Sequence, residues 1–264
     1  MNWLTSLPAW VLVVGCLFIA LLVAYLSRIG LQAVIPASEK DRVHQIASPL
    51  MSALGAAFAI FAALSLASEA GYLRTSEGIV SDEAAAASRL AWASTSPRGE
   101  SEPVHAALLQ YLQDTRAKEW TGGAAASGDD PAVGSAIAEL ERSVRAEVAG
   151  PHLTTAASTE LLTSLDDVTS TRRERIAAAS HDVPALYVVT LIASGAALIV
   201  NGGALVFRDS LRTSLLIVGV ATVVGLSLAL LFALAAPWRG PLIVSGHPLD
   251  AIISDLKSGF FHGG

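Results

Sequence analysis

Four long runs of apolar residues alternate with polar stretches along the chain, and none of the four contains an acidic or basic side chain. Each run has the length, about 20 residues, that an α-helix needs to cross the hydrocarbon core of a bilayer. The runs cover residues 7–27, 49–68, 185–207 and 213–235. They predict four transmembrane helices in two hairpins, which occupy residues 1–68 and 185–236.

The first run could also be a secretory signal, but two features favour a retained span. A signal begins with a basic segment and has an apolar core of about 7–15 residues. Here no Lys or Arg precedes Arg28, and the apolar run continues from Leu7 to Leu26. We therefore interpret this segment as the first transmembrane helix.

The second run, from Pro49 to Ala67, is rich in alanine, glycine and serine. Small side chains let another helix backbone approach closely, as packed membrane helices require. The bulky side chains Phe58, Phe61 and Leu64 recur every three residues and so lie near one line along the helix. The chain becomes polar at Glu69 directly afterwards. We interpret Glu69 as the polar end of the span, in preference to one charge of a ring in an oligomer.

Residues 69–184 are predicted to form a soluble bundle of helices, because apolar positions recur there at helical spacing and no convincing strand pattern is present. The expected helices begin at the cap Ser81-Asp82-Glu83, run from Pro103 to Trp120, from Asp130-Pro131 to Gly150, and over about 154–180. A flexible link is expected at 121–130. The tail, 237–264, is expected to carry a short amphipathic helix. The predicted fold is an all-α membrane protein with four transmembrane helices and a soluble helical bundle inserted between the second and third.

Charge and chemistry narrow the function further. The formal charge of −6 is concentrated in residues 69–184, where 18 acidic and 10 basic side chains give a net charge of −8. The absence of a basic stripe with aromatics argues against binding to nucleic acid. Cys16 is the only cysteine, the six histidines lack metal-ligand spacing, and the pairs Asp129-Asp130 and Asp166-Asp167 are typical of caps or solvated faces. We expect no catalytic residue, no metal and no cofactor, so an enzyme is not expected.

The side of the membrane on which residues 69–184 lie is not decided by the basic residues. The two connectors carry five, whereas the terminal segments on the other side carry two, Arg239 and Lys257. This difference favours connectors in the cytoplasm and the bundle outside. Counting also the basic residues of the bundle near the span ends raises the second number to six, and the preference disappears. The connector residues are Arg28, Lys40, Arg42, Arg208 and Arg212, and those near the span ends are Arg74, Arg172, Arg173 and Arg175.

Arg172 and Arg175 are the most informative polar residues, because their spacing puts both on one helix face. They would either attract anions to a pore mouth or bind lipid phosphates, or else pair with Glu83 or Glu119 between helices of the bundle. We favour the pairing. Asn201, the only amide in a span, is expected to satisfy a backbone group or bind interfacial water.

Several short motifs follow one another in an order that is fairly specific to one family. They are Val80-x-x-Glu83-Ala84, Tyr111 ahead of Glu119-Trp120, Arg172-Arg173-x-Arg175-Ile176, Val183-Pro184-x-Leu186-Tyr187, and Pro237-Trp238-Arg239-Gly240 leading to Val244-Ser245 and Leu249. With these motifs the chain resembles the bestrophin-like domain family of bacterial membrane proteins, a group of unassigned function. Two features depart from that pattern: Trp238 stands where Phe is expected, and the link at 121–130 is unusually rich in Gly and Ala.

The resemblance implies four membrane helices around a helical domain. By analogy with true bestrophins it also implies an oligomeric, for instance pentameric, anion channel with that domain in the cytoplasm. In such channels the second helix lines the pore and narrows it with apolar rings, a role that Phe58, Ile60 and Phe61 would take here. The alternative, which we favour for these side chains, is that they face lipid or a neighbouring helix.

Two functions therefore remain open. One is an oligomeric ion channel, with the lipid bilayer and further copies of the chain as partners. The other is a non-conducting membrane scaffold or sensor whose helical domain docks a partner protein. The alanine-rich, lysine-poor composition is typical of bacteria and indicates a multi-pass protein of the bacterial cytoplasmic membrane.

Overall fold

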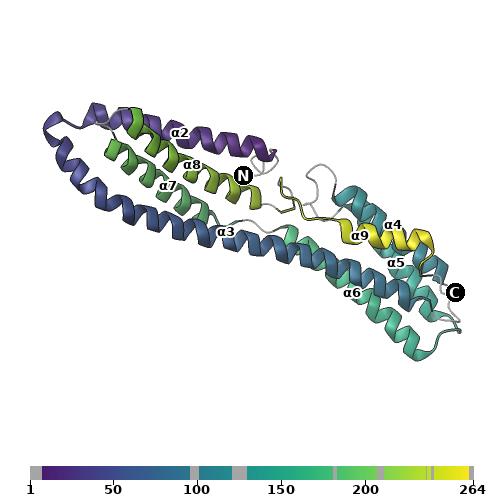
Figure 1. The fold of residues 1–264 in the computed structure, drawn as a ribbon. Coiled ribbons are helices and arrows are strands. Elements are labelled where there is room, and N and C mark those ends of the chain that lie inside the picture. The colour runs from purple at the N-terminus through teal and green to yellow at the C-terminus, as the bar shows by residue number, and fades with distance from the viewer. Residues whose placement is uncertain are drawn as a thin grey trace. The chain divides into compact units, whose positions relative to one another are not determined.

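Most of the residues that the computed structural model describes are helical; the described residues are 8–95, 101–120, 130–180, 183–206, 211–235, 237–238 and 241–261. Within them lie eight α-helices and the short 3-10 helix η1, Ala37–Glu39 (Figure 1). The α-helices are α2 Ala9–Val34, α3 Lys40–Ala93, α4 Ser101–Glu119, α5 Pro131–Ala149, α6 Thr155–Ala179, α7 Ala185–Val206, α8 Leu211–Leu234 and α9 His247–Ser258. Residues 121–129 of the expected link, the connector at 207–210 and residues 239–240 fall outside the described part.

The chain divides into two compact units, and the division falls within α3. Unit 1 comprises Met1–Tyr72 and Asp182–Leu242, and unit 2 comprises Leu73–His181 and Ile243–Gly264. The sequence placed the first boundary a few residues earlier, at 68/69, and treated 237–264 as a separate tail. In the structure, most of that tail belongs to unit 2.

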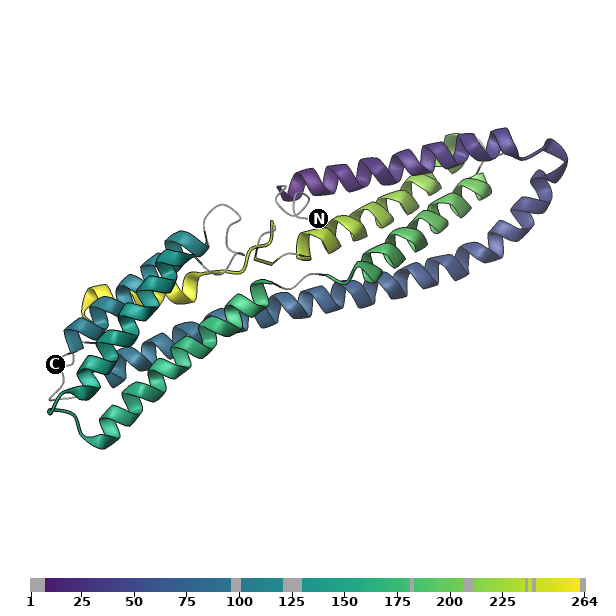
Figure 2. The ribbon, with the colours of Figure 1, turned by 180° about the vertical axis from the view of Figure 1, so that it is seen from behind.

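Unit 1 contains the helices that are long and apolar enough to cross a membrane. Four such helices are found among the described residues: α2, α3, α7 and, from Leu215 to Leu234, α8. In both views α2, α7 and α8 lie side by side (Figures 1 and 2). All four helices contribute buried side chains to one apolar core, among them Ala20, Phe58, Leu191 and Val224.

Glycine residues allow two pairs of these helices, α2 with α8 and α7 with α8, to come very close. A Cβ atom on Gly225 of α8 would lie 3.0 Å from the Cα atom of Leu17 and 3.3 Å from the Cβ atom of Ala20, both on α2. A Cβ atom on Gly195 of α7 would lie 2.7 Å from a methyl group of Val224. The small residues of the spans therefore set how closely the helices pack.

Unit 2 contains α4, α5, α6, α9 and the C-terminal part of α3. Helix α4 packs against α5 and α9, and α5 packs against α6 (Figure 2). Their apolar faces form the core, with side chains such as Leu90, Leu108, Leu140 and Val168 fully buried. Helix α9 is amphipathic, as predicted, and buries Leu249 and Leu256.

The predicted helix start at Ser81 is wrong, because α3 continues through this position without interruption. The Ser81 hydroxyl donates to the Glu77 carbonyl oxygen at 3.1 Å, a local bond that a serine inside a helix can make. Buried residues continue at three- and four-residue spacing through Ser76, Val80, Glu83 and Ala87, so packing outweighs the capping signal. Helix α3 also begins before the apolar run and includes Pro49.

The other helix ends of unit 2 follow the sequence closely. Asp130 caps α5 by accepting a hydrogen bond from the backbone amide of Ala132 at 2.8 Å, and Pro131 occupies the first turn. The hydroxyl of Thr154 caps α6 in the same way, at 3.2 Å from the amide of Ala157. Helix α4 starts at Ser101, two residues before the predicted Pro103.

Candidate functional site

The most distinctive polar arrangement is a buried cluster of two acids and two arginines in unit 2. Arg175 of α6 binds Glu83 of α3 through Nε at 2.5 Å and Nη2 at 3.4 Å, and its Nη1 also pairs with Glu119 of α4. Arg172 contacts the other carboxylate oxygen of Glu119 at 3.3 Å. All four side chains are less than a tenth exposed. We call these four residues the charge cluster; its formal charges balance.

Aromatic side chains complete the surroundings of the charge cluster. The Tyr111 hydroxyl donates a short hydrogen bond to Glu83, and the Arg172 guanidinium lies 5.8 Å from the centre of the Tyr111 ring. The Arg175 guanidinium lies 5.2 Å from the centre of the Trp120 ring. These distances are within the range of cation–π attraction.

Burial and neighbouring charges together raise the pKa of both Tyr111 and Arg175. Burial raises the pKa of Tyr111 well above its usual value, and the neighbouring Glu83 carboxylate raises it further. For Arg175, burial alone would lower the pKa, but Glu83, Tyr111 and Glu119 together outweigh it and raise the pKa. Tyr111 therefore stays neutral and Arg175 stays charged, so the cluster holds fixed ion pairs.

The C-terminal segment is attached to the same helices. Arg116 of α4 binds both carboxylate oxygens of Asp250 in α9, at 2.6 and 2.8 Å, and the pKa of Asp250 is lowered chiefly by this hydrogen bond. The Trp120 indole donates to the Val244 carbonyl oxygen at 3.0 Å. Gly246 lies against the Arg116 guanidinium, where a Cβ atom would come within 2.6 Å.

The structure thus brings together four of the eight residues that the sequence singled out. Glu83, Glu119, Arg172 and Arg175 pair between helices, the interpretation favoured for the two arginines. With both guanidiniums buried and bound to carboxylates, neither is presented to an ion in solution. The sequence did not select Tyr111 as a bonding partner, although Tyr111 and Glu119 lie two turns apart on one face of α4.

The remaining four candidates lie in unit 1. Phe58 is 4% exposed and belongs to the core, whereas Ile60 and Phe61 are 58% and 40% exposed. Glu69 is buried, and α3 continues through it. The Asn201 amide donates to the Ala47 carbonyl oxygen at 2.9 Å, which confirms that it satisfies a backbone group.

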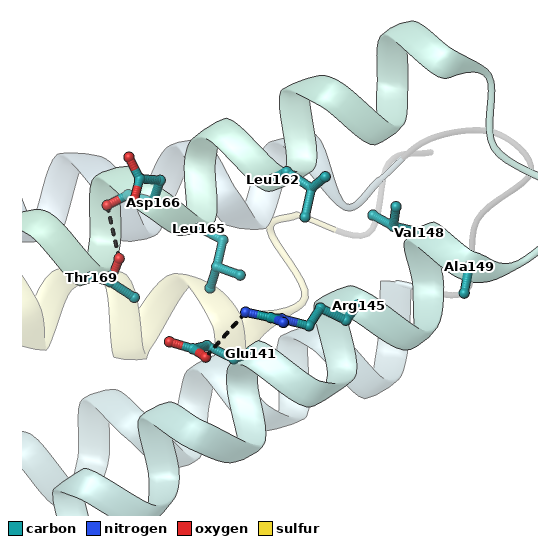
Figure 3. A pocket seen from close by; sticks show the side chains of 8 residues that line it. All are labelled: Glu141, Arg145, Val148, Ala149, Leu162, Leu165, Asp166 and Thr169. Carbon is teal, nitrogen blue, oxygen red and sulfur yellow. Dashed lines mark hydrogen bonds and ion pairs between the residues drawn. The ribbon is translucent and has the colours of Figure 1, made fainter.

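A pocket of about 430 Å³ lies between α5 and α6 (Figure 3). Its floor is apolar, and its polar side chains already have partners: Arg145 pairs with Glu141 at 3.7 Å, and Thr169 donates to the Asp166 carbonyl oxygen at 3.0 Å. The lining residues are Glu141, Arg145, Val148, Ala149, Leu162, Leu165, Asp166 and Thr169. They include no histidine or cysteine, and the described residues hold no group of three or more side chains suited to a metal ion.

Comparison with known proteins identifies the family. The model of the bestrophin-like domain matches residues 8–249. The chain belongs to the bestrophin-like family. It is therefore a multi-pass membrane protein. No curated protein sequence matches it at a significant level.

Solved structures show the same bestrophin fold. A bacterial bestrophin homolog from Klebsiella pneumoniae, in a variant with Asp replaced by Ala, superposes with a TM-score of 0.70 at 13% identity, covering 95% of this chain and 99% of that one. A variant of such a homolog with Ile replaced by Thr gives 0.68 at 13% identity, covering 93% and 98%. At this identity the likeness concerns the fold alone. The bestrophin-like fold thus extends over most of the chain.

Proposed function

We propose that this bestrophin-like protein is an oligomeric anion channel whose apolar constriction is formed by the second span. In this proposal unit 1 is the membrane part, and unit 2 is a helical bundle in water inserted between the second and third spans. Several copies of α3 would surround one pore. The proposed location is the cytoplasmic membrane of a bacterium.

The observation that carries the proposal is the exposure pattern along the second span. Phe58 turns into the core of its own unit, while Ile60 and Phe61 turn outward. Large apolar side chains that leave the core of a membrane monomer face lipid, pack against another copy or line a shared pore, and the proposal assigns Ile60 and Phe61 to the pore. A constriction of this kind gates by excluding water and needs no charged side chain, and residues 49–67 contain none.

Flux through liposomes tests the proposal directly. Purified protein is reconstituted, and chloride and cation currents are recorded for the wild type, for Phe61→Ala and for the control Phe18→Ala. Phe18 is an exposed phenylalanine on α2 and is not proposed to face the pore. We expect Phe61→Ala to increase the current by widening the constriction, and Phe18→Ala to leave it unchanged.

The mass of the protein in mild detergent supplies the second measurement, because a pore lined by one helix per copy requires a ring. A monomer that conducts no ion would refute the channel proposal. Equal effects of the two alanine variants would refute the assignment of Phe61 to the constriction.

A non-conducting scaffold is the second candidate, and the pocket between α5 and α6 favours it. Leu162 is 42% exposed at this pocket, so a partner protein could bury it. If the purified protein folds but conducts no ion, the scaffold is the function that remains.

A further inference from the structure

Two hydroxyl groups in unit 2 are buried without a bonding partner. Ser76 of α3 and Thr115 of α4 are both fully buried, and neither hydroxyl has a hydrogen-bond partner among the residues that the structure describes. Other Ser and Thr side chains in this unit donate to a backbone carbonyl one turn earlier, as Thr163 does to Thr159 at 2.8 Å. Ser76 and Thr115 do not use this local solution.

A buried hydroxyl without a partner is unfavourable, because it loses its bonds to water on folding and gains none. Nearly all buried polar side chains in proteins have a partner, either in the protein or in an ordered water molecule. Each of the two hydroxyls therefore points to a bonding partner that the described residues do not supply.

The helix register places the two hydroxyls in the same layer. His105 contacts the Ala91 carbonyl oxygen at 3.0 Å and Tyr111 contacts Glu83, so α3 and α4 run antiparallel. Thr115 lies one turn beyond Tyr111, about 6 Å along the axis, and Ser76 lies two turns from Glu83, about 10 Å in the same direction. The two hydroxyls are thus separated by about 5 Å along the helices, on the faces that carry the charge cluster.

The charge cluster lies beside this layer. Glu119 follows Thr115 by one turn on α4, and long helical side chains lean toward the preceding turn. An ionised carboxylate has about four acceptor positions. The contacts with Arg172 and Arg175 leave some of those positions available.

We propose that Ser76 and Thr115 hold a buried water molecule that bridges the two hydroxyls to the Glu119 carboxylate. Water suits the site because it can donate to the carboxylate and still exchange hydrogen bonds with both hydroxyls. It is also neutral, whereas a cation would add a charge to a cluster whose two acids and two arginines already balance. The site belongs to unit 2 and does not depend on conduction.

The sign of a stability change tests the proposal. Thr115→Val keeps the shape of the side chain and removes the hydroxyl. If water is bound, the full-length protein in detergent should unfold at a midpoint about 2–4 °C lower, because the water loses a partner. If the hydroxyl is unpaired, the same substitution should raise the midpoint. Thr115→Ser keeps the hydroxyl as the matched control, and Thr163→Val reports on an exposed threonine that bonds to its own helix.

The double variant Ser76→Ala/Thr115→Val tests whether one ligand is shared. We expect its midpoint to fall by less than the sum of the single effects, because either substitution already disrupts the bridge. A higher midpoint for Thr115→Val, or additive effects, would overturn the proposal. A wild-type midpoint that falls when sodium or potassium is replaced by choline, with no such change in Thr115→Val, would identify a cation instead and overturn it too.

Discussion

Arg175 is the residue on which the charge cluster depends most, and replacing it by methionine tests the role of the cluster. Arg175→Met keeps much of the side-chain volume and removes the charge. Glu83 then loses both of its contacts with the guanidinium, and Glu119 loses one of two. The two carboxylates are 0% and 1% exposed, so water cannot replace the lost partner without structural change.

The expected loss of stability is large because the substitution leaves a buried carboxylate without its cationic partner. Removing one member of a buried ion pair costs about 3–5 kcal/mol. For a unit of this size, that corresponds to a fall in the unfolding midpoint on the order of 10 °C. Thermal unfolding of the full-length protein in detergent, followed by tryptophan fluorescence, measures it; Trp120 lies beside Arg175 and reports on the cluster.

Two comparisons make the result specific. Arg173→Met changes a neighbouring arginine that is 71% exposed and forms a long ion pair of 3.9 Å with Asp166. Because exposed ion pairs contribute little to stability, this substitution should move the midpoint by no more than about 2 °C. Adding Glu83→Gln to Arg175→Met removes the carboxylate that is left without a guanidinium and keeps the pair of Arg172 with Glu119, so it should restore more than half of the loss. Equal midpoints for the two methionine variants would refute the reasoning.

Three further predictions concern packing and the C-terminal segment. Gly225→Leu should destabilise the protein by about 1–3 kcal/mol or prevent assembly of unit 1, because the new side chain meets the α2 backbone. Gly219→Leu on the same helix places its side chain in open space, so it should have little effect in the same melting assay. Asn201→Leu should cost about 1 kcal/mol in detergent melts, because the Ala47 carbonyl oxygen loses its donor; an unchanged midpoint would show that the bond contributes nothing. Arg116 lowers the pKa of Asp250, so their ion pair should protect α9 from hydrogen exchange above about pH 4 and lose this effect as the pH falls through the lowered pKa. Asp250→Asn should remove that pH dependence. Gly246→Ala should weaken the protection of α9, because the added methyl group displaces the Arg116 guanidinium.

The local signals in the sequence predicted the helices well. Asp130 caps α5 as predicted, α6 spans Thr155–Ala179 where a helix over about 154–180 was expected, and the apolar runs lie in the helices suited to spanning a membrane. Signals of this kind act over a few residues, so they can be read without knowledge of the fold. The helix start predicted at Ser81 was wrong for the same reason. Its capping signal is local, but the burial that keeps α3 continuous involves helices distant in the sequence.

The pairing in the site was only partly predictable. The spacing of Arg172 and Arg175 correctly predicted that they share one helix face. Which of Glu83 and Glu119 they bind, however, depends on where α3 and α4 lie against α6. Arg175 in fact binds both. Partners separated by 92 residues, as Glu83 and Arg175 are, leave no periodic signal in a single sequence. The attachment of Arg116 to Asp250, 134 residues away, was missed for the same reason.

The polar side chains of unit 1 bear on how the proposed channel would work. Three of them donate to backbone carbonyl oxygens: Ser194 to that of Leu191, Asn201 to that of Ala47 and Thr222 to that of Val218. The hydrogen atoms donated in this way serve helix packing and are not available to an anion. The outward face of α3 instead offers Ile60 and Phe61. A pore lined by that face would oppose ions by removing their water, a barrier that acts on both signs of charge. Discrimination between anions and cations would then have to come from charges outside the 49–67 stretch.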